Sequence, residues 1–243
     1  MDPLKRMHTN TTLVINPKGG SGKTTVAINL ASYFASKEIP TTIMDYDPQG
    51  SSLHWARSRP PDRMRIHGAN AAPEKFGRLR SYAMYVPPET RQLIIDAPAG
   101  AHGVMLQEMI DRAHSVIVPV VPSAIDIHAS SNFIRELLHA TRVRSGAVRL
   151  AIVANKVRRS MPAYQPLERF LNSMQLKWLA RLIDSDVYLK AAETGLGIFE
   201  LDSLSVAECK QFMPIIEWVE ERRAPRETPD GGVVYELARS RLA

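Results

Sequence analysis

The sequence has little cysteine and no long apolar run. Cys209 is the single cysteine in 243 residues, which excludes an intrachain disulfide framework and a CxxC zinc site. The longest apolar stretch, 116–121, already contains Pro119, and it is far shorter than the roughly 18 residues of a membrane span. The opening MDPLKRMHTN lacks the apolar region of a secretory signal. These absences favour a cytoplasmic protein.

The overall composition is that of an ordinary globular protein. Hydrophobic residues make up 44% and charged residues 23% of the chain, which excludes disordered, collagen-like and coiled-coil proteins. A chain of 243 residues is long enough to bury a core without disulfides or metal. The net charge of +6 is compatible with an anionic partner. The seven histidines show no metal-ligand spacing.

Short apolar segments alternate with helix-length amphipathic stretches. This pattern is typical of βαβ units, so it predicts an α/β fold with a single doubly wound, mostly parallel sheet and helices on both faces. Residues 60–88 are less regular and contain several prolines around a helix-like stretch at 74–82. The expected strands are 12–16, 41–45, 92–96, 115–119 and 148–153.

The C-terminal part predicts a long amphipathic helix over 206–223. The breaker-rich segment APRETPDGG follows it. Residues 233–242 then fit either a short docked helix or a tail. We therefore expect one main domain over 1–223, with 224–243 as a linker and C-terminal tail or short docked helix.

The strongest motif is NPKGGSGKTT at 16–25, between an expected strand and an expected helix. Glycines let backbone N–H groups point at phosphate oxygens, and the start of the helix adds its positive end. Lys23 is placed to reach the β- and γ-phosphates, and the Thr24 hydroxyl to bind Mg²⁺. The generic GxxxxGK[ST] pattern needs glycine at Pro17, but the KGGxGKT variant matches at every position. The candidate nucleotide-binding residues of this loop are Gly19, Gly20, Ser21, Gly22, Lys23, Thr24 and Thr25.

KGGSGKT resembles the deviant Walker A motif of the ParA/MinD superfamily of P-loop ATPases. The resemblance implies ATP and Mg²⁺ as cofactors, and a homodimer that sandwiches ATP, in which Lys18 reaches the partner's phosphates. It covers roughly residues 12–220 and is strongest to small ParF-like partition ATPases and McdA-type carboxysome-positioning ATPases. No N-terminal helix-turn-helix domain is present, so site-specific operator recognition is not expected. The supporting segments are INPKGGSGKTT, DYDPQGSSLHW, VIVPVVPSAIDIHAS and DVYLKAAETGLGIFEL.

Two acidic segments fall where this family places carboxylates. DYDPQ resembles the family's DxDPQ segment, which makes Asp47 the residue that positions the attacking water and a possible metal ligand. LIIDAPAG looks like the Walker B strand, in which Asp96 holds Mg²⁺ through water. Carboxylates suit this place because the metal balances the charge that builds on the phosphates. The alternative for a strand-end Asp is a helix cap or a loop residue.

Two further segments resemble the parts of the family that surround the adenine. Asn155 follows an expected strand and resembles an adenine-reading residue, although a turn-forming Asn fits equally well. The loop that begins at Pro122 and runs to Asp126 resembles the loop that lines the adenine in ParF-type members.

Basic residues gather in two places. The stretch 137–167 contains no Asp or Glu, and a second cluster comprises Arg57, Arg59, Arg63 and Arg65. Such stretches are expected of proteins that contact the DNA backbone without sequence specificity, but a solvated face is the alternative. The candidate DNA-binding residues are Arg142, Arg144, Arg158, Arg159, Lys177, Arg181, Lys190, Arg222 and Arg223, with Arg149 and Lys156 also in the acid-free stretch.

The resemblance implies a ParA-type ATPase, cytoplasmic and nucleoid-associated. On ATP it would dimerise and bind nucleoid DNA nonspecifically, and it would position a plasmid, a chromosome region or a protein organelle such as a carboxysome. An adaptor protein on the cargo would stimulate a weak intrinsic ATPase in which Lys18, Lys23 and Asp47 are the catalytic residues.

Two alternatives remain open. A MinD-like membrane-cycling regulator would need an amphipathic C-terminal helix, and the tail 233–243 is short, has Glu236 and lacks Trp and Phe. A metabolic or metal-insertion enzyme of the superfamily would need a further catalytic constellation, which the sequence does not show. The lone Cys209 disfavours the iron–sulfur and zinc-linked members.

Overall fold

The structure is a computed structural model of the 243-residue chain. It describes residues 9–73, 83–122, 124–158, 165, 168–169, 172, 178–201, 205–221, 226–227 and 233–234. The helix expected at 74–82 lies outside the described residues.

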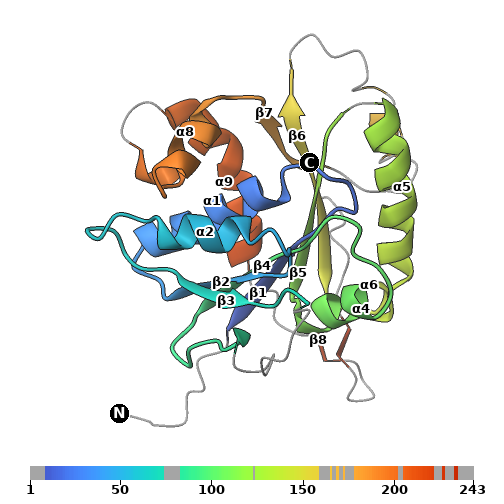
Figure 1. The fold of residues 1–243 in the computed structure, drawn as a ribbon. Coiled ribbons are helices and arrows are strands. Elements are labelled where there is room, and N and C mark those ends of the chain that lie inside the picture. The colour runs from blue at the N-terminus through green and yellow to red at the C-terminus, as the bar shows by residue number, and fades with distance from the viewer. Residues whose placement is uncertain are drawn as a thin grey trace.

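A seven-stranded sheet runs through the described part of the chain, in the order β3-β2-β4-β1-β5-β6-β7. Every neighbouring pair is parallel, so all carboxyl ends of the strands lie at one edge (Figure 1). This confirms the predicted α/β class. The strands are β1 Asn10–Val14, β2 Thr41–Asp45, β3 His67–Asn70, β4 Gln92–Asp96, β5 Ser115–Val120, β6 Arg149–Val157 and β7 Trp178–Ile183.

The expected strands agree closely with the observed ones, but two strands were not expected. β2 and β4 have the predicted bounds, whereas β1 ends before Asn16 and β6 continues to Val157. The missed strands are β3, whose sequence HGAN has no apolar run, and β7, in which Arg181 is exposed. Both lie at the outer edges of the sheet and are only partly buried, so they lack the continuous apolar run of the inner strands.

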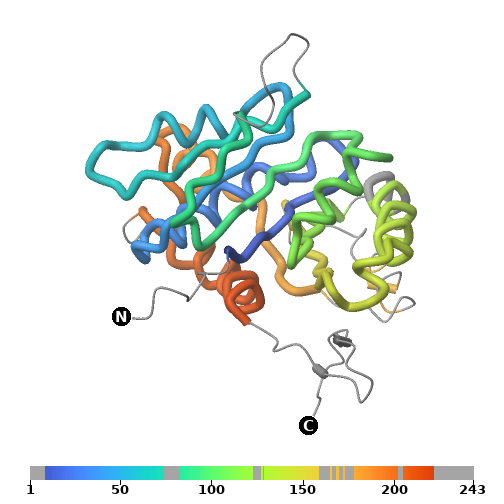
Figure 2. The backbone as a smooth tube through the Cα atoms, turned by 90° about the horizontal axis from the view of Figure 1, so that it is seen from below, coloured from blue at the N-terminus to red at the C-terminus, as the bar shows by residue number. Residues whose placement is uncertain are grey.

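Helices cover both faces of the sheet, as its parallel topology requires. Side chains of α1, α2, α8, α9 and the 3₁₀ helix η1 share one buried cluster, and those of α4, α5 and α6 share the other. Figure 2 shows α5, in yellow-green, well apart from the orange-red α9. The helices are α1 Lys23–Ser36, α2 Ser51–Arg57, α4 Gly103–Arg112, α5 Ala124–His139, α6 Thr141–Arg144, α8 Val187–Glu193, η1 Ile198–Glu200 and α9 Val206–Glu220.

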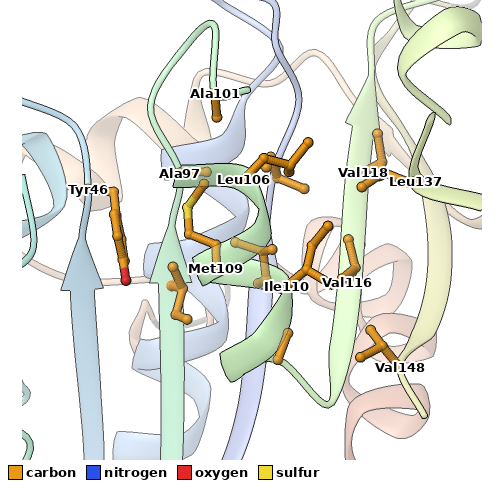
Figure 3. Close-up of a cluster of buried hydrophobic side chains, with 14 of the residues drawn as sticks. Tyr46, Ala97, Ala101, Leu106, Met109, Ile110, Val116, Val118, Leu137 and Val148 are labelled. Atoms are coloured by element: carbon orange, nitrogen blue, oxygen red, sulfur yellow. The ribbon is translucent and has the colours of Figure 1, made fainter. Parts of the chain in front are cut away.

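Neighbouring residues of the inner strands point into opposite clusters. On β5, Val116 packs toward α4 and α5 while Ile117 packs toward α1 and α9. Figure 3 shows Leu106, Met109 and Ile110 of α4 directed at the strands beneath. The inner strands are therefore buried on both sides, which explains their near-continuous apolar sequence.

The C-terminal segment contributes two short strands. β8 Arg226–Glu227 pairs antiparallel with β9 Val233–Val234, so these four residues are extended and not helical. Residues 235–243 lie outside the described residues, and the domain division at 223 remains a prediction. Among the described residues, no helix combines the length and apolar character that crossing a membrane requires.

Candidate functional site

The loop between β1 and α1 lies at the carboxyl edge of the sheet. Gly20 and Gly22 have positive φ angles of 75° and 91°, which glycine adopts without strain. A Cβ on Gly22 would lie 1.8 Å from Asn155 Nδ2. The GSG turn is therefore needed both for its backbone conformation and for its close approach to β6.

Asn16 holds this loop in place, a role that the sequence did not predict. Its buried side chain donates to the Pro119 carbonyl at 2.8 Å and to Ser130 Oγ at 3.1 Å. Its Oδ1 accepts from the Lys18 N–H at 2.9 Å. Asn16 thus joins the loop to β5 and α5. A polar residue at the end of the apolar run was the available signal.

Lys23 lies inside the loop. Its side chain is buried, and Nζ donates to the Lys18 carbonyl at 3.1 Å. Ser21 Oγ donates to the same carbonyl at 3.1 Å. Burial lowers the Lys23 pKa, against the opposing effect of the Asp96 and Asp47 carboxylates. Gly19 and Gly20 are exposed, while Lys18, Thr24 and Thr25 are half-buried.

Asp96 is a buried carboxylate at the end of β4. Burial, and then the neighbouring Asp45, raise its pKa to about 7, while a hydrogen bond from Thr24 and the Lys23 charge oppose the rise. Asp96 Oδ1 has no hydrogen-bond partner in the described part of the chain. A buried carboxylate oxygen without a donor is costly, which marks this position as one built to bind something.

Asp45 stands beside Asp96 because the two residues are register partners on β2 and β4. Its buried carboxylate accepts from Ser52 Oγ at 2.7 Å, from the Ser52 N–H at 3.1 Å and from the Asp47 N–H at 2.8 Å. Burial raises its pKa, against these hydrogen bonds. Asp45 therefore ties the first turn of α2 to the site. This role was not predicted from the sequence, although Asp45 ends a buried strand.

The half-buried Asp47 follows on the connecting loop. Its Oδ1 accepts from the Gln49 N–H at 2.9 Å. The structure thus brings Asp47 to the same edge as Lys23 and Asp96.

These residues fit a magnesium ion that is bound mainly through a nucleotide. Within the ranges that the structure describes, no group of three His, Cys, Asp or Glu could hold a metal by itself. Mg²⁺ bound to phosphates needs only one or two protein ligands. The Thr24 hydroxyl and the unsatisfied Asp96 Oδ1 supply that chemistry.

The segment after Asp96 is bonded to the phosphate loop. The Gly100 N–H donates to the Pro17 carbonyl at 2.8 Å, and Gly100 has a positive φ of 71°. A displacement of the segment after Asp96 would therefore also move the phosphate loop.

The two expected adenine-side residues have different surroundings. Asn155 is buried within β6, and its Nδ2 donates to the Ser21 carbonyl at 2.9 Å. Its alternative role in a turn after a strand is therefore wrong. Pro122 is buried between β5 and α5. Because α5 begins at Ala124, the expected loop to Asp126 is shorter than predicted.

Residues 12–197 match the family described as the CobQ/CobB/MinD/ParA nucleotide binding domain. The chain belongs to this family. As a MinD/ParA family member it is similar to "Maintenance of carboxysome distribution protein A" of Gloeobacter kilaueensis, with 26% identity over 77% of this chain and 82% of the relative. The fold resembles that of a Cyanothece McdA variant in complex with ATP, with a TM-score of 0.67, 15% identity, and coverage of 90% and 99% of the two chains. It also resembles Pyrococcus horikoshii MinD with Mg-ADP, with a TM-score of 0.64, 15% identity, and coverage of 88% and 97%.

The candidate DNA-binding residues lie on several different elements, and some of them form bonds with other residues of the protein. Arg142 donates to the Ile110 and Asp111 carbonyls at the end of α4. Arg158 pairs with Asp184 at 2.7 Å and Arg181 with Glu168 at 2.8 Å. Arg144, Lys156 and Lys190 are exposed, and Arg149 packs on the Trp218 ring. The residues Arg159, Lys177, Arg222 and Arg223 lie outside the described residues.

The second basic cluster is not the uniform surface that the sequence suggested. Arg59 forms an ion pair with Glu200 at 2.5 Å, and the two side chains are only 4% and 2% exposed. Arg57, Arg63 and Arg65 are exposed. Arg59 is therefore structural, and its acidic partner is too distant in sequence for any local pattern to indicate it.

Proposed function

We propose that the chain is a ParA-type ATPase that dimerises on ATP, binds nucleoid DNA nonspecifically and positions or segregates a cargo. The observation that carries this proposal is the group formed by Lys23, Asp96 and Asp47 at one edge of the sheet, with an unsatisfied buried Asp96 oxygen beside Thr24. The name of the Gloeobacter relative supports a carboxysome as cargo. A plasmid or a chromosome region is the other class of cargo.

The chemistry follows from the place of each group. Backbone N–H groups of 19–22 and the Lys23 ammonium bind the phosphate oxygens, and Asn155 and Asn16 keep the loop in its shape. Thr24, and Asp96 through water, would hold Mg²⁺, and the metal would balance the charge on the phosphates. Asp47 orients the water for in-line attack on the γ-phosphate.

Dimerisation and stimulation rest on the family motif. Lys18 would bind the phosphates of the partner subunit's nucleotide, so that two ATP molecules lie between the subunits. Asp47 lies on a half-buried loop, and hydrolysis would stay slow until the dimer and a cargo-bound adaptor order that loop. Hydrolysis would then return monomers that release DNA.

The test is the fluorescence anisotropy of a random-sequence DNA duplex, titrated in ATP-Mg²⁺ and in ADP-Mg²⁺ at two salt concentrations. We expect tight binding only with ATP, weakening steeply with salt because phosphate contacts release counterions. Asp47→Ala should hold the ATP form on DNA, and a rapid ATPase in that variant would remove Asp47 from its role.

Sedimentation with anionic liposomes is the second arm of this test. Equal DNA affinity with ATP and ADP, or no binding with either, would refute the DNA-binding cycle. ATP-dependent sedimentation together with no DNA binding would favour the MinD-like alternative.

A further inference from the structure

Four arginines lie within the nine residues 57–65, at the end of α2 and in the loop that follows. The structure separates them into one buried residue and three exposed residues. The buried Arg59 explains how the other three are held.

Arg59 fastens the loop from inside. Its guanidinium donates to both carboxylate oxygens of Glu200, and Nη1 also reaches the Gly195 carbonyl at 3.2 Å. Its Nε donates to the Met64 carbonyl at 3.2 Å, across the turn of its own loop. The guanidinium also lies 5.3 Å from the centre of the Trp55 ring. The loop is thus held at both ends by a single buried side chain.

The loop is also packed closely against the segment after α8. Trp55 Nε1 donates to the Leu196 carbonyl at 3.0 Å. Gly195 has a positive φ of 70°, and a Cβ there would lie 2.4 Å from the Ser58 carbonyl oxygen. Because the backbone of this loop is already fixed, little of its conformational entropy is lost when its side chains bind a partner.

The three remaining arginines take no part in these contacts. Arg57 and Arg65 are exposed and make no hydrogen bond or ion pair with the described residues. Arg63 lies 3.8 Å from Asp62, with side-chain exposures of 44% and 74%, so the pair is weak. None of the large exposed hydrophobic side chains of the described chain lies between 51 and 66.

We propose that Arg57, Arg63 and Arg65, the α2 arginine surface, contact the phosphate backbone of duplex DNA. Guanidinium groups bind phosphates through paired N–H donors, and nonspecific DNA binding rests on such contacts. A protein partner would more typically need an aromatic or apolar anchor, and residues 51–66 expose no large hydrophobic side chain. The inference rests on the proposed function and assigns part of its DNA-binding surface.

The place of the surface connects it to the nucleotide. α2 starts at Ser51, and Ser52 donates to Asp45 beside Asp96. Arg57 therefore ends the helix whose first turn is bonded to Asp45, and Arg63 and Arg65 lie in the loop that follows this helix. Figure 1 shows α2 and α8, which carries the exposed Lys190, on the same side of the sheet.

The experiment compares three proteins in the DNA anisotropy assay with ATP-Mg²⁺, over a series of salt concentrations. The first is the wild type, and the second is Arg57→Ala/Arg63→Ala/Arg65→Ala. The third is a control of equal charge change, Lys37→Ala/Arg112→Ala/Arg135→Ala, at positions away from α2. Thermal melts and ATP binding verify that each variant is folded and holds nucleotide.

We expect the α2 variant to bind at least about tenfold more weakly. Its slope of log K against log salt should fall by about 3 for each subunit that contacts the DNA, or about 1 for each lost phosphate contact. The control should keep the wild-type slope. Replacing the same three arginines by lysine should restore most of the slope, since the charge is kept.

Failure of this inference is distinguishable from failure of the proposed function. If the wild type does not bind DNA with ATP, the proposed function falls, and this inference falls with it. If the wild type binds and the α2 variant matches the control, only the α2 assignment is overturned, and an acidic protein becomes the partner to test on this surface.

Discussion

The buried charges around Glu200 and those around Asp96 are satisfied to different degrees. The Glu200 carboxylate accepts hydrogen bonds from both terminal nitrogens, Nη1 and Nη2, of Arg59. Its Oε2 also accepts from the Gly197 N–H at 2.9 Å. Asp96 is equally buried but stands beside a second carboxylate, Asp45, with Oδ1 left without a partner in the described residues.

The difference separates a structural charge from a functional one. A buried ion pair with complete hydrogen bonds holds segments together, here the loop after α2 and the 3₁₀ helix η1, and it needs no ligand. Buried carboxylates with a raised pKa and an unsatisfied oxygen destabilise the fold until they bind a cation or accept a hydrogen bond. The Asp96 side is therefore where ligand binding changes the molecule most.

The largest expected effect is on the functional side. Lys23→Ala should raise the Kd for ATP by about 100-fold or more, because it removes the charged donor to the phosphates. Its melting temperature should fall little, since burial already disfavours the Lys23 ammonium. Isothermal titration with ATP-Mg²⁺ measures the loss, with Lys37→Ala as the control. Retained ATP affinity would remove Lys23 from the phosphate site.

The next effect is on the structural side. Arg59→Ala leaves Glu200 buried without its cation, so the free energy of unfolding should fall by about 3 to 5 kcal/mol. ATP affinity of the folded fraction should stay close to the wild type. Urea denaturation checks the stability, and Arg57→Ala, two residues earlier at the end of α2, serves as the exposed control. A loss no larger than that of the control would show that the pair is not structural.

A smaller, pH-dependent effect comes from Asp96. Its folded-state pKa of about 7 lies above the ordinary value of 3.8, so the folded protein binds more protons than the unfolded chain between these two values. The free energy of unfolding should therefore fall as the pH rises from about 4 to about 7. The fall is up to about 4 kcal/mol, since each pH unit contributes about 1.4 kcal/mol.

Urea denaturation in EDTA across this range, on the wild type and Asp96→Asn, measures the effect. The variant should show a flatter profile, because it has no carboxyl group to titrate at this position. A wild-type stability that rises over the same window would contradict the assignment of the raised pKa.

The sequence predicted the parts of the molecule that depend on local pattern. The inner strands carry apolar runs, and the phosphate loop is one continuous motif, so both were found. β3 and β7 were missed because edge strands are only partly buried. Arg59 was assigned to a basic surface because Glu200 is 141 residues away in sequence. Asn16 and Asp45 were missed because their roles lie in hydrogen bonds to loops and helices that the fold brings to them.

The most direct test of the account is the mass of the particle in solution, measured by light scattering, for the wild type and Lys18→Ala in ATP-Mg²⁺ and ADP-Mg²⁺. We expect the wild type to be dimeric with ATP and monomeric with ADP. Lys18→Ala should bind ATP and remain monomeric, because it lacks the cation that reaches the partner's phosphates. A Lys18→Ala dimer with wild-type ATPase activity would contradict the proposed ATP-sandwich mechanism.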